Sequence, residues 1–353
     1  MNTIKYVGLD VHKAITVIAV LNEQGQVESR SQIKTKANNF RDFFRGLSGT
    51  VHVVLEEGGW SAWLHKLLKP LVTSATVCDP RHNKLIGAGN KSDDQDAESL
   101  ARLLRLGELK SVYKGDAEQV ALRELFRAYD NLVGNTTRAQ NRLKAIYRGR
   151  GLDCSGRSLL RADQRDFWLA QLPEEASQFR ARMLLLEIDN LQLLRKQAKT
   201  RLLEACKKHS ASAILMKIPG FGPVRVSALI AIVATPHRFR TKRQFWPYCG
   251  FSVVQHTSAD YIESEGRIIK KQKKAATRGL NRNHHPQLKA VFKGAALTAL
   301  RDETFRAYYD RLVAEGTKPE LALISVARKL ACVALTIWQR NEEYDPTKVF
   351  AKA

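Results

Sequence analysis

Paired cysteines and long apolar segments are what this chain most clearly lacks. Its five cysteines are scattered and form no CxxC pair, which argues against a structural zinc site and a disulfide framework. The longest uninterrupted apolar run, around residues 228–234, is far shorter than the roughly 20 residues that cross a bilayer. The chain opens without a basic segment followed by an apolar one, so we expect no secretion signal. These absences favour reduced thiols in a cytosol-like compartment and no membrane partner.

Negative charge is also scarce. Asp and Glu together number 35 against 58 Lys and Arg, which gives a formal net charge of +23. Phosphate groups are the partner that most rewards such an excess, because each contact releases condensed counterions. We therefore expect a nucleic-acid-binding protein whose affinity falls with salt. With 353 residues, 44% of them hydrophobic, the chain is long enough for two or three domains with ordinary cores.

The N-terminal part predicts a mixed α/β domain. β-Branched and apolar runs predict strands, and apolar residues at helical spacing predict helices. The expected strands are 4–10, 15–22, 27–33, 51–57 and 74–79, and the expected helices are about 38–47, 60–68 and 93–106. An antiparallel meander of three strands followed by alternating helix and strand is the order of a ribonuclease-H-type domain. We expect this domain to span residues 1–112.

The middle of the chain, 113–212, predicts a helical domain. Segments 117–147 and 174–208 are long and helical in pattern, with one apolar stripe each. Two such helices without a sheet of their own favour an antiparallel coiled-coil hairpin, a common dimer contact or nucleic-acid clamp. The stripes are Leu122, Leu125, Phe126 and Tyr129, and Leu184, Leu185, Ile188, Leu191 and Leu194. Residues 149–172, with stretches rich in Gly, Ser and Arg, are expected to be irregular.

The remaining domain, 213–353, is expected to be mostly helical, with helices at about 285–300, 302–315 and 318–340. Near its start IPGFGP is followed by VRVSALIAIV, a pattern typical of a helix-hairpin-helix. Gly220 and Gly222 would let backbone N–H groups approach a DNA phosphate, with a helix N-terminus and Arg225 behind them. The alternative is a Gly/Pro turn between two core helices.

Four carboxylates carry the candidate chemistry. Asp10 and Glu56 each close an apolar strand, whereas Asp93 and Asp96 stand three residues apart on an expected helix and project from one face. In a sheet of this order the first and fourth strands are neighbours, so Asp10 and Glu56 would meet. Four carboxylates repel one another without cations, and their hard oxygens suit Mg²⁺. We therefore expect two Mg²⁺ ions, with Mn²⁺ as a substitute, in a phosphodiester-cleaving site.

Some of these carboxylates also have a plain structural interpretation. Asp10 alone is more often a turn or capping residue, and Asp93 is a natural N-cap for the helix that follows it. Glu57 competes with Glu56, since alternation along the strand places only one of the two on the same face as Val54.

A second cluster lies far downstream, around Ser258 in QHTSAD. A serine in a polar loop usually faces solvent, so Ser258 alone says little. Basic residues follow it closely, and they are most simply a solvated loop that attracts phosphate. Those expected to bind nucleic acid are Arg267, Lys270, Lys271, Lys273 and Lys274.

Taken together, these motifs resemble the transposases of the insertion-sequence one-ten family, also described as bridge-RNA-guided recombinases. The strand-borne Asp10, EEGG at 56–59 and KSDDQDA at 91–97 are similar to the carboxylate motifs of that family's RuvC-like domain. IPGFGP, the segment FWPYCGF and TSA at 257–259 are similar to its C-terminal transposase domain. The likeness covers nearly the whole chain. It departs at Ala259, where the family has glycine, and at 270–288, where basic residues are inserted.

The resemblance implies a DEDD tetrad of Asp10, Glu56, Asp93 and Asp96, with Ser258 as the nucleophile. The implied activity is DNA transposition or recombination, with Mg²⁺ and a phosphoserine ester serving strand exchange. The implied partners are donor and target DNA, a structured bridge RNA and further copies of the chain in a dimer or tetramer. The implied location is the cytoplasm of a prokaryote, in association with the nucleoid.

Two other functions fit the same residues. A RuvC-like Holliday-junction endonuclease would use metal-bound water, with Ser258 incidental. A nucleic-acid-binding scaffold with an inactive site would need only the positive charge and the glycine hairpin. The presence of all four carboxylates counts against the scaffold.

Overall fold

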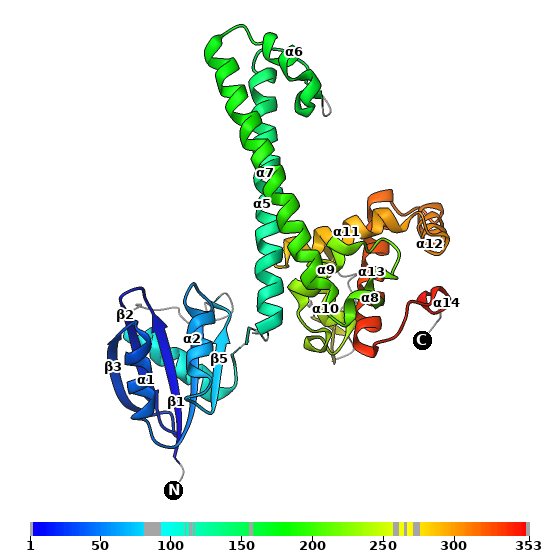
Figure 1. Ribbon diagram of the computed structural model, residues 1–353. Coiled ribbons are helices and arrows are strands. Elements are labelled where there is room, and N and C mark those ends of the chain that lie inside the picture. The colour runs from blue at the N-terminus through cyan, green and yellow to red at the C-terminus, as the bar shows by residue number, and fades with distance from the viewer. Residues whose placement is uncertain are drawn as a thin grey trace. The chain divides into compact units, whose positions relative to one another are not determined.

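The structure is a computed structural model that describes residues 3–80, 93–109, 111–112, 115, 117–154, 158–256, 261–264, 267–270 and 276–350. For 93, 94, 117 and the strand residues within 255–278 it describes the backbone. The chain divides into two compact units, Met1–Lys114 and Gly115–Ala353 (Figure 1). The first is a mixed α/β unit, and the second is mostly helical. The finer boundary at residue 212 stays a prediction.

The first unit is built on a five-stranded sheet in the order β3-β2-β1-β4-β5. β2 pairs antiparallel with β1 and β3, whereas β4 pairs parallel with β1 and β5. The strands are β1 Ile4–Val11, β2 Ile15–Leu21, β3 Val27–Lys34, β4 Thr50–Glu56 and β5 Ser74–Cys78. The five strands predicted from the sequence are therefore confirmed, and the first and fourth are neighbours as expected.

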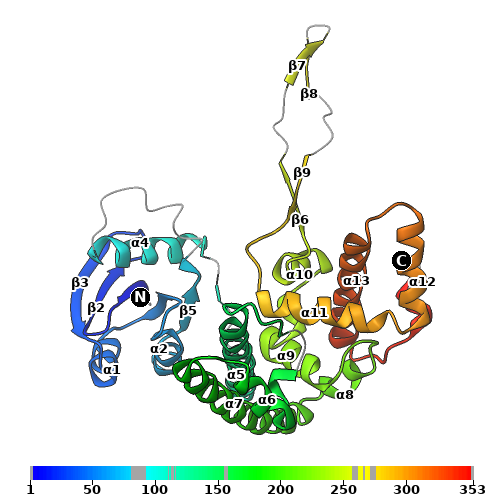
Figure 2. The ribbon, with the colours of Figure 1, turned by 90° about the horizontal axis from the view of Figure 1, so that it is seen from above.

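Alternation along the strands gives this sheet two apolar faces. One face packs on α1 and α2, and the other packs on α4 (Figure 2). The helices are α1 Ala37–Arg45, α2 Ser61–Leu68 and α4 Asp93–Leu106. Leu9 and Leu55 belong to the first face, whereas Gly8 and Val54 belong to the face under α4.

α4 lies so close to the sheet that Gly8 has no room for a side chain. A Cβ atom there would lie 1.9 Å from the carbonyl oxygen of Ala97 and 2.8 Å from the amide nitrogen of Ala101. Both alanines are fully buried, and their small side chains let the helix backbone approach the strand. Gly8 therefore fixes where along β1 the first turns of α4 lie.

The second unit begins with two long helices, α5 (Ala117–Arg148) and α7 (Glu175–Lys207), which lie side by side and antiparallel (Figure 1). Arg142 on α5 pairs with Glu187 on α7 at 2.7 Å. The helices predicted at 117–147 and 174–208 are confirmed. The predicted apolar stripe was wrong at Leu194, whose side chain is 48% exposed.

Two separate apolar cores hold this helix pair. One core lies near the connection and includes Leu143 and Ile188. The other lies at the opposite end and includes Phe126 and Leu202, which join the core of the C-terminal helices. In the fully described stretches between them, 127–138 and 189–201, no hydrophobic side chain is buried. The middle of the pair is therefore loosely packed.

The connection between α5 and α7 was predicted to be irregular, and this was only partly correct. It contains three short helices, η1 Ser158–Leu160, η2 Ala162–Gln164 and α6 Arg165–Ala170. Leu159 and Leu169 are buried in the core that they share with α5 and α7. Such short apolar runs carry too little periodicity to predict helices from sequence.

The C-terminal helices pack around a single core. They are α8 Ala211–Met216, α9 Pro223–Val233, η3 Pro236–Arg238, α10 Lys242–Cys249, α11 Pro286–Ala299, α12 Glu303–Ala314, α13 Pro319–Arg340 and α14 Pro346–Val349. The three helices predicted after residue 285 are confirmed. Among the described residues, α13 alone is long and apolar enough to pass as a membrane span, and half of its most apolar window is buried. Val326 and Leu330 lie fully buried in the core, which is typical of a core helix.

A two-part β ladder, which we call the arm, projects from these helices (Figure 2). β6 (Val253–His256) pairs antiparallel with β9 (Ala276–Leu280), and β7 (Tyr261–Ser264) pairs antiparallel with β8 (Arg267–Lys270). A basic loop was expected here from the sequence, and the strands were not predicted. The β-branched residues of VVQH and RIIK were the available signal.

Candidate functional site

Asp10 and Glu56 lie at one edge of the sheet. β1 and β4 are parallel neighbours, with Leu9 opposite Leu55, so the next residues of the two strands are Asp10 and Glu56. Both share the face of Gly8 and Val54 by alternation, and this is the face that α4 covers. The predicted meeting of these two strand ends is therefore present in the backbone.

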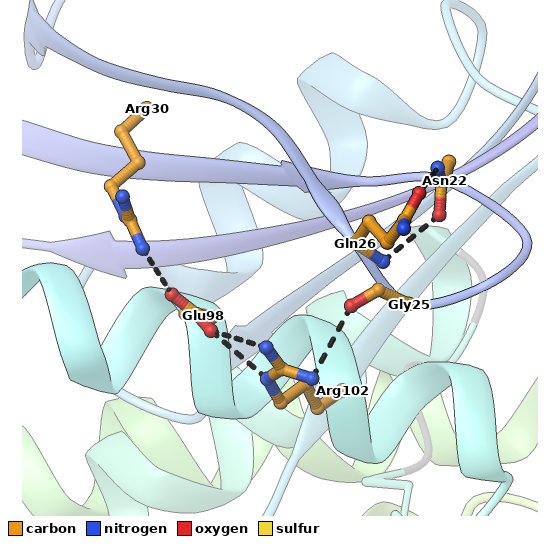
Figure 3. A network of polar contacts seen from close by, with 6 residues as sticks. All are labelled: Asn22, Gly25, Gln26, Arg30, Glu98 and Arg102. Carbon is orange, nitrogen blue, oxygen red and sulfur yellow. Dashed lines mark hydrogen bonds and ion pairs between the residues drawn. The ribbon is translucent and has the colours of Figure 1, made fainter.

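The direction of α4 brings its first turn to the same edge. Arg102, near the end of α4, donates from Nη1 to the carbonyl oxygen of Gly25 at 3.2 Å (Figure 3). Gly25 lies in the turn between β2 and β3, beside the start of β1, because Leu21 pairs with Tyr6. The C-terminal end of α4 is thus at the start of β1. α4 therefore runs antiparallel to β1 and begins at the edge that holds Asp10 and Glu56.

The two helix carboxylates follow from this orientation. Asp93 precedes Ala97 by one helical turn, and Ala97 lies directly over Gly8. Asp96 precedes Leu100 by one turn, and Leu100 packs with Val54 of β4. The backbone thus brings position 93 towards the end of β1 and position 96 towards the end of β4. The side chain of Asp96 is exposed, whereas that of Asp93 lies outside the described residues.

His12 is a further residue at this edge, and it was not predicted from the sequence. His12 Nε2 lies 3.0 Å from Asp10 Oδ2, within hydrogen-bond distance, and the two side chains are 51% and 24% exposed. Residues two apart on an extended chain point to the same side, so the spacing of Asp10 and His12 was the available signal. The partly exposed imidazole can orient the carboxylate through this contact.

Glu57 takes a different position from Glu56. Ser61 Oγ donates to Glu57 Oε2 at 3.2 Å, which ties Glu57 to the first residue of α2. α2 covers the opposite face of the sheet from α4. The expectation that only one of the two glutamates shares the face of Val54 is therefore confirmed, with Glu56 as that residue.

A charged network holds α4 against the sheet. Glu98 accepts from Arg30 Nη2 of β3 at 2.7 Å and from Arg102 Nη2 at 2.6 Å (Figure 3). The hydrogen bond from Arg30, followed by that from Arg102, holds the pKa of the Glu98 carboxyl below its usual value. Glu98 lies between Asp96 and Leu100 on the helix, so the network fixes the turn that carries the candidate site.

The residues at this edge suit a hard divalent cation. Asp10, Glu56, Asp93 and Asp96 offer carboxylate oxygens, which Mg²⁺ prefers over nitrogen and sulfur ligands. Among the side chains that the structure describes, which do not include Asp93, no group of three or more His, Cys, Asp or Glu is arranged to hold a metal. The two-metal assignment therefore remains a prediction supported by the convergence of the four backbone positions.

The glycine turn of the second unit is built into the core. Gly220 has φ +84°, and a Cβ atom there would lie 2.2 Å from the carbonyl oxygen of Ala295 in α11. Gly222 caps α9, with open space around its Cα. Gly220 is therefore needed because a side chain would clash with α11, and Gly222 is needed as the cap of α9. Gly222 also has the open space that a phosphate bound to the backbone would need.

The guanidinium of Arg225 makes hydrogen bonds within the protein. Its Nη1 donates to the carbonyl oxygen of Gly220 at 2.7 Å and to Thr298 Oγ1 at 3.1 Å. Burial lowers the pKa of this guanidinium from its ordinary value. Arg225 thus clamps the turn between α8 and α9 to α11. A phosphate contact from this residue stays a prediction.

Most of the downstream cluster lies outside the described residues. This applies to Ser258 and to the basic residues Lys271, Lys273 and Lys274. Arg267 and Lys270 are the two ends of β8, where they pair with Ser264 and Tyr261. In the sequence, Ser258 falls between the end of β6 and the start of β7.

Two family models match the chain. Residues 7–149 match a model described as a transposase, of the DEDD type of IS110, and residues 212–277 match one described as transposase IS116/IS110/IS902 family. Together the two matches cover more than half of the chain. The first includes all four carboxylates, and the second includes the glycine turn and Ser258.

Two curated relatives extend the likeness. A protein of Pseudomonas aeruginosa named "Probable family 20 transposase" is 27% identical over 259 residues, which cover 71% of this chain and 75% of that protein. The transposase for insertion sequence element IS1111A of Coxiella burnetii is 21% identical, over 98% of this chain and 92% of that protein. The similarity therefore extends over nearly the full length.

Proposed function

Because the chain belongs to the IS110 family of transposases, we propose that it cuts and rejoins DNA strands at a carboxylate site, with Ser258 as the nucleophile. One observation supports this most. The start of α4 and the ends of β1 and β4 converge at one edge of the sheet, so Asp10, Glu56, Asp93 and Asp96 come from three elements to one place. A purely structural carboxylate needs no such convergence.

We assign the first unit to the RuvC-like, ribonuclease-H-type fold. The strand order β3-β2-β1-β4-β5, with β4 and β5 parallel to β1, supports that assignment. The α5–α7 pair is the proposed coiled coil, and α8, the glycine turn and α9 are the proposed helix-hairpin-helix. The open space at Gly222 supports a backbone contact to phosphate there.

The four carboxylates would hold two Mg²⁺ ions. Bound there, the metal would polarise the scissile phosphate and stabilise the charge on the leaving oxygen. Asp10 would be oriented by His12, and the Glu98 network would hold Asp93 and Asp96 over the strand ends. Each element at this edge would therefore have a defined role in binding the metal or in positioning its ligands.

Ser258 would act on the phosphorus atom. Its Oγ forms a new P–O bond, the P–O bond to the leaving deoxyribose breaks, and the hydroxyl proton of Ser258 passes to solvent while the leaving oxygen takes one up. The resulting phosphoserine ester conserves the bond energy until a second strand end reverses the step.

A bridge RNA would choose the donor and target DNA, and the chain would act as a dimer or tetramer. The net charge of +23 supports binding of both nucleic acids. The proposed location is the cytoplasm of a prokaryote, with the protein bound to the nucleoid.

The decisive experiment looks for the covalent ester. The full-length protein and RNA transcribed from the element's non-coding end are incubated with Mg²⁺ and labelled DNA carrying the element and its flanks, and the products are separated on a denaturing gel. We expect a protein–DNA adduct with the wild-type chain, none with Ser258→Ala, and peptide mapping to residue 258. Thr257→Ala is the matched control and should retain the adduct.

Other results would assign the chemistry differently. Free DNA ends without an adduct would indicate attack by water, as in a Holliday-junction endonuclease. Binding without cleavage, under conditions where a relative cleaves, would indicate a scaffold. An adduct that survives Ser258→Ala would transfer the nucleophile to another residue, with Thr257 and Ser252 as the nearest candidates.

A further inference from the structure

Two tryptophan side chains stay exposed at the start of α2, although large aromatic rings normally contribute to cores and interfaces. Trp60 is the N-cap residue of this helix and is 40% exposed, and Trp63 lies in its first turn and is 36% exposed. The two rings meet edge to face, with centroids 5.7 Å apart. Trp63 also meets the fully buried ring of Phe40 in α1, with centroids 6.0 Å apart. The first unit therefore holds in place two rings that solvent still reaches.

These rings lie at the edge of the sheet that carries the candidate site. α2 follows β4 closely, so it begins at the edge where Glu56 ends that strand. The chain from Glu56 to Trp60 spans at most about 14 Å between the two Cα atoms. Successive bases along one DNA strand are about 3.4 Å apart, so Trp60 lies within roughly four bases of a phosphate held at Glu56. In the loop between them a Cβ atom at Gly58 or Gly59 would meet nothing within 4 Å, which leaves this side open to a ligand.

Two exposed lysines flank the same edge. Lys13 lies between β1 and β2, and Lys36 is the N-cap residue of α1. The two segments are joined, because the amide of Thr35 donates to the carbonyl oxygen of Ala14 at 2.9 Å. Aromatic rings that stack on bases, together with cations that attract the phosphates, are the combination by which proteins bind unpaired nucleic acid. The net charge of +23 favours the same kind of ligand.

The exposed area of the two rings is too small for a protein partner. An aromatic side chain offers at most about 250 Å², so the two exposed fractions leave roughly 200 Å² in contact with solvent. Each partner of a stable protein pair buries about 800 Å². A planar base needs only one or two rings, and stacking stabilises it whatever its sequence. The rings of Trp60 and Trp63 therefore fit a nucleobase better than a protein surface.

We propose that Trp60 and Trp63 stack on an unpaired base of the DNA strand that is cut, within about four bases of the scissile phosphate. A base inside a duplex is covered by its neighbours, so the rings reach it only where the strands have opened. The stack holds the opened strand at the carboxylate edge, while Lys13 and Lys36 attract the adjacent phosphates. DNA is favoured over RNA because the carboxylates beside the rings act on DNA. The identity of this strand rests on the proposed function, to which the stack adds residues that neither cut DNA nor bind metal.

The first test measures binding and needs no cleavage. The full-length chain is titrated at fixed salt with two labelled DNA duplexes of one sequence, one fully paired and one whose central bases are unpaired. We expect Trp60→Leu to raise the Kd for the unpaired DNA about tenfold and that for the paired DNA less than about twofold. Trp60→Phe keeps a ring and should keep both constants near the wild-type values.

The control for this titration is Phe167→Leu, which removes a ring that is 62% exposed on α6 of the second unit and should change neither constant. Equal losses on the two DNAs in Trp60→Leu, or no loss on either, would overturn the proposal. A selective loss confined to an unpaired RNA of the same sequence would assign the rings to RNA and overturn the DNA assignment.

The second test separates the stack from the chemistry. In the cleavage reaction with Mg²⁺ and RNA, Trp60→Leu should raise the DNA concentration for half-maximal cleavage about tenfold and change the saturated rate less than about threefold. A lower saturated rate with an unchanged half-maximal concentration would indicate a structural role and overturn the contact. If the wild-type chain cuts no DNA, the proposed function fails, whereas the first test still decides whether the rings bind unpaired bases. Normal cleavage without selective loss in the first test would remove the stack and leave the proposed function standing.

Discussion

α4 and α7 use their surfaces in opposite ways. α4 approaches the sheet so closely that Gly8 cannot carry a Cβ atom, and a network of Glu98, Arg30 and Arg102 ties its outer side to the same sheet. α7 packs on α5 at its two ends, leaves the middle loosely covered and presents a second apolar face to solvent. A helix that must place chemical groups is held on several sides. A helix with an exposed apolar face has surface available for contact with another molecule.

The largest effect that would test this comparison is expected at the strand end beside α4. Asp10→Asn removes a charge from the proposed metal site, and we expect strand cleavage to fall about 10³-fold while DNA binding persists. Gel assays of cleavage and of binding on the same DNA measure the two quantities. Glu57→Gln is the control, because Glu57 is tied to Ser61 on the other side of the sheet. Near-normal cleavage by Asp10→Asn would remove Asp10 from the site.

The two faces of α7 should differ next most strongly. Ile188→Ala leaves a cavity in the inner core and should destabilise the second unit by about 2–4 kcal/mol. Leu193→Ala, on the exposed face of α7, should change the stability of the monomer by less than about 0.5 kcal/mol. Denaturant unfolding at a concentration that keeps the chain monomeric measures both. Similar losses in the two variants would mean that the exposed face of α7 is already packed within one chain.

The close approach of α4 to β1 predicts a third, smaller effect on stability and cleavage. Gly8→Ala forces the helix backbone away from β1, and we expect a loss of about 1–3 kcal/mol in the first unit, together with slower cleavage. Gly58→Ala is the control, since a Cβ atom there meets nothing within 4 Å. Hydrogen exchange of the α4 amides, followed by mass spectrometry, reports the change locally. Unchanged exchange in Gly8→Ala would show that α4 can shift without loss.

The Glu98 network should give the smallest effect, with a defined pH dependence. Hydrogen bonds from Arg30 and Arg102 lower the pKa of folded Glu98, so its contribution is complete above the pKa of an unfolded glutamate. That contribution is lost as the pH falls through the lowered folded value. Glu98→Gln should therefore weaken protection of α4 by about 1 kcal/mol at pH 7, and the difference from wild type should shrink in acid. A difference that grows in acid would contradict the assignment.

Much of the first unit could be predicted from the sequence. Most of the strands there are runs of apolar and β-branched residues bounded by turns, and the order of elements determined the neighbours of β1. The same order predicted that Asp10 and Glu56 would meet. The close approach at Gly8 could not be predicted, since a glycine inside a strand does not say which helix lies over it. His12 was missed because an isolated histidine after a strand has many possible partners.

The second unit shows which structural features the sequence pattern could not predict. The long helices α5 and α7 carry enough periodicity to be predicted, but the pattern did not separate the buried Leu184 from the exposed Leu194. A helix with apolar residues on two faces offers two stripes, and only packing shows which of them is covered. The arm was missed because β6 and β8 have only four residues each, too few to show a clear alternation, and basic residues that favour a loop assignment follow β8.

The place of α13 in the fold bears on how the protein is made. The five strands of the sheet and the helices α1, α2 and α4 all lie within Met1–Lys114, so the first unit can fold as soon as it leaves the ribosome. The core of the second unit is completed by α13 and by Val349, close to the end of the chain, and these follow about 10–50 s later at ordinary rates of synthesis. A ribosome that stops early would therefore release a folded sheet with its carboxylates but without a finished partner unit. Each complete molecule passes through such a stage, in which the acidic edge exists before the core of the second unit is complete.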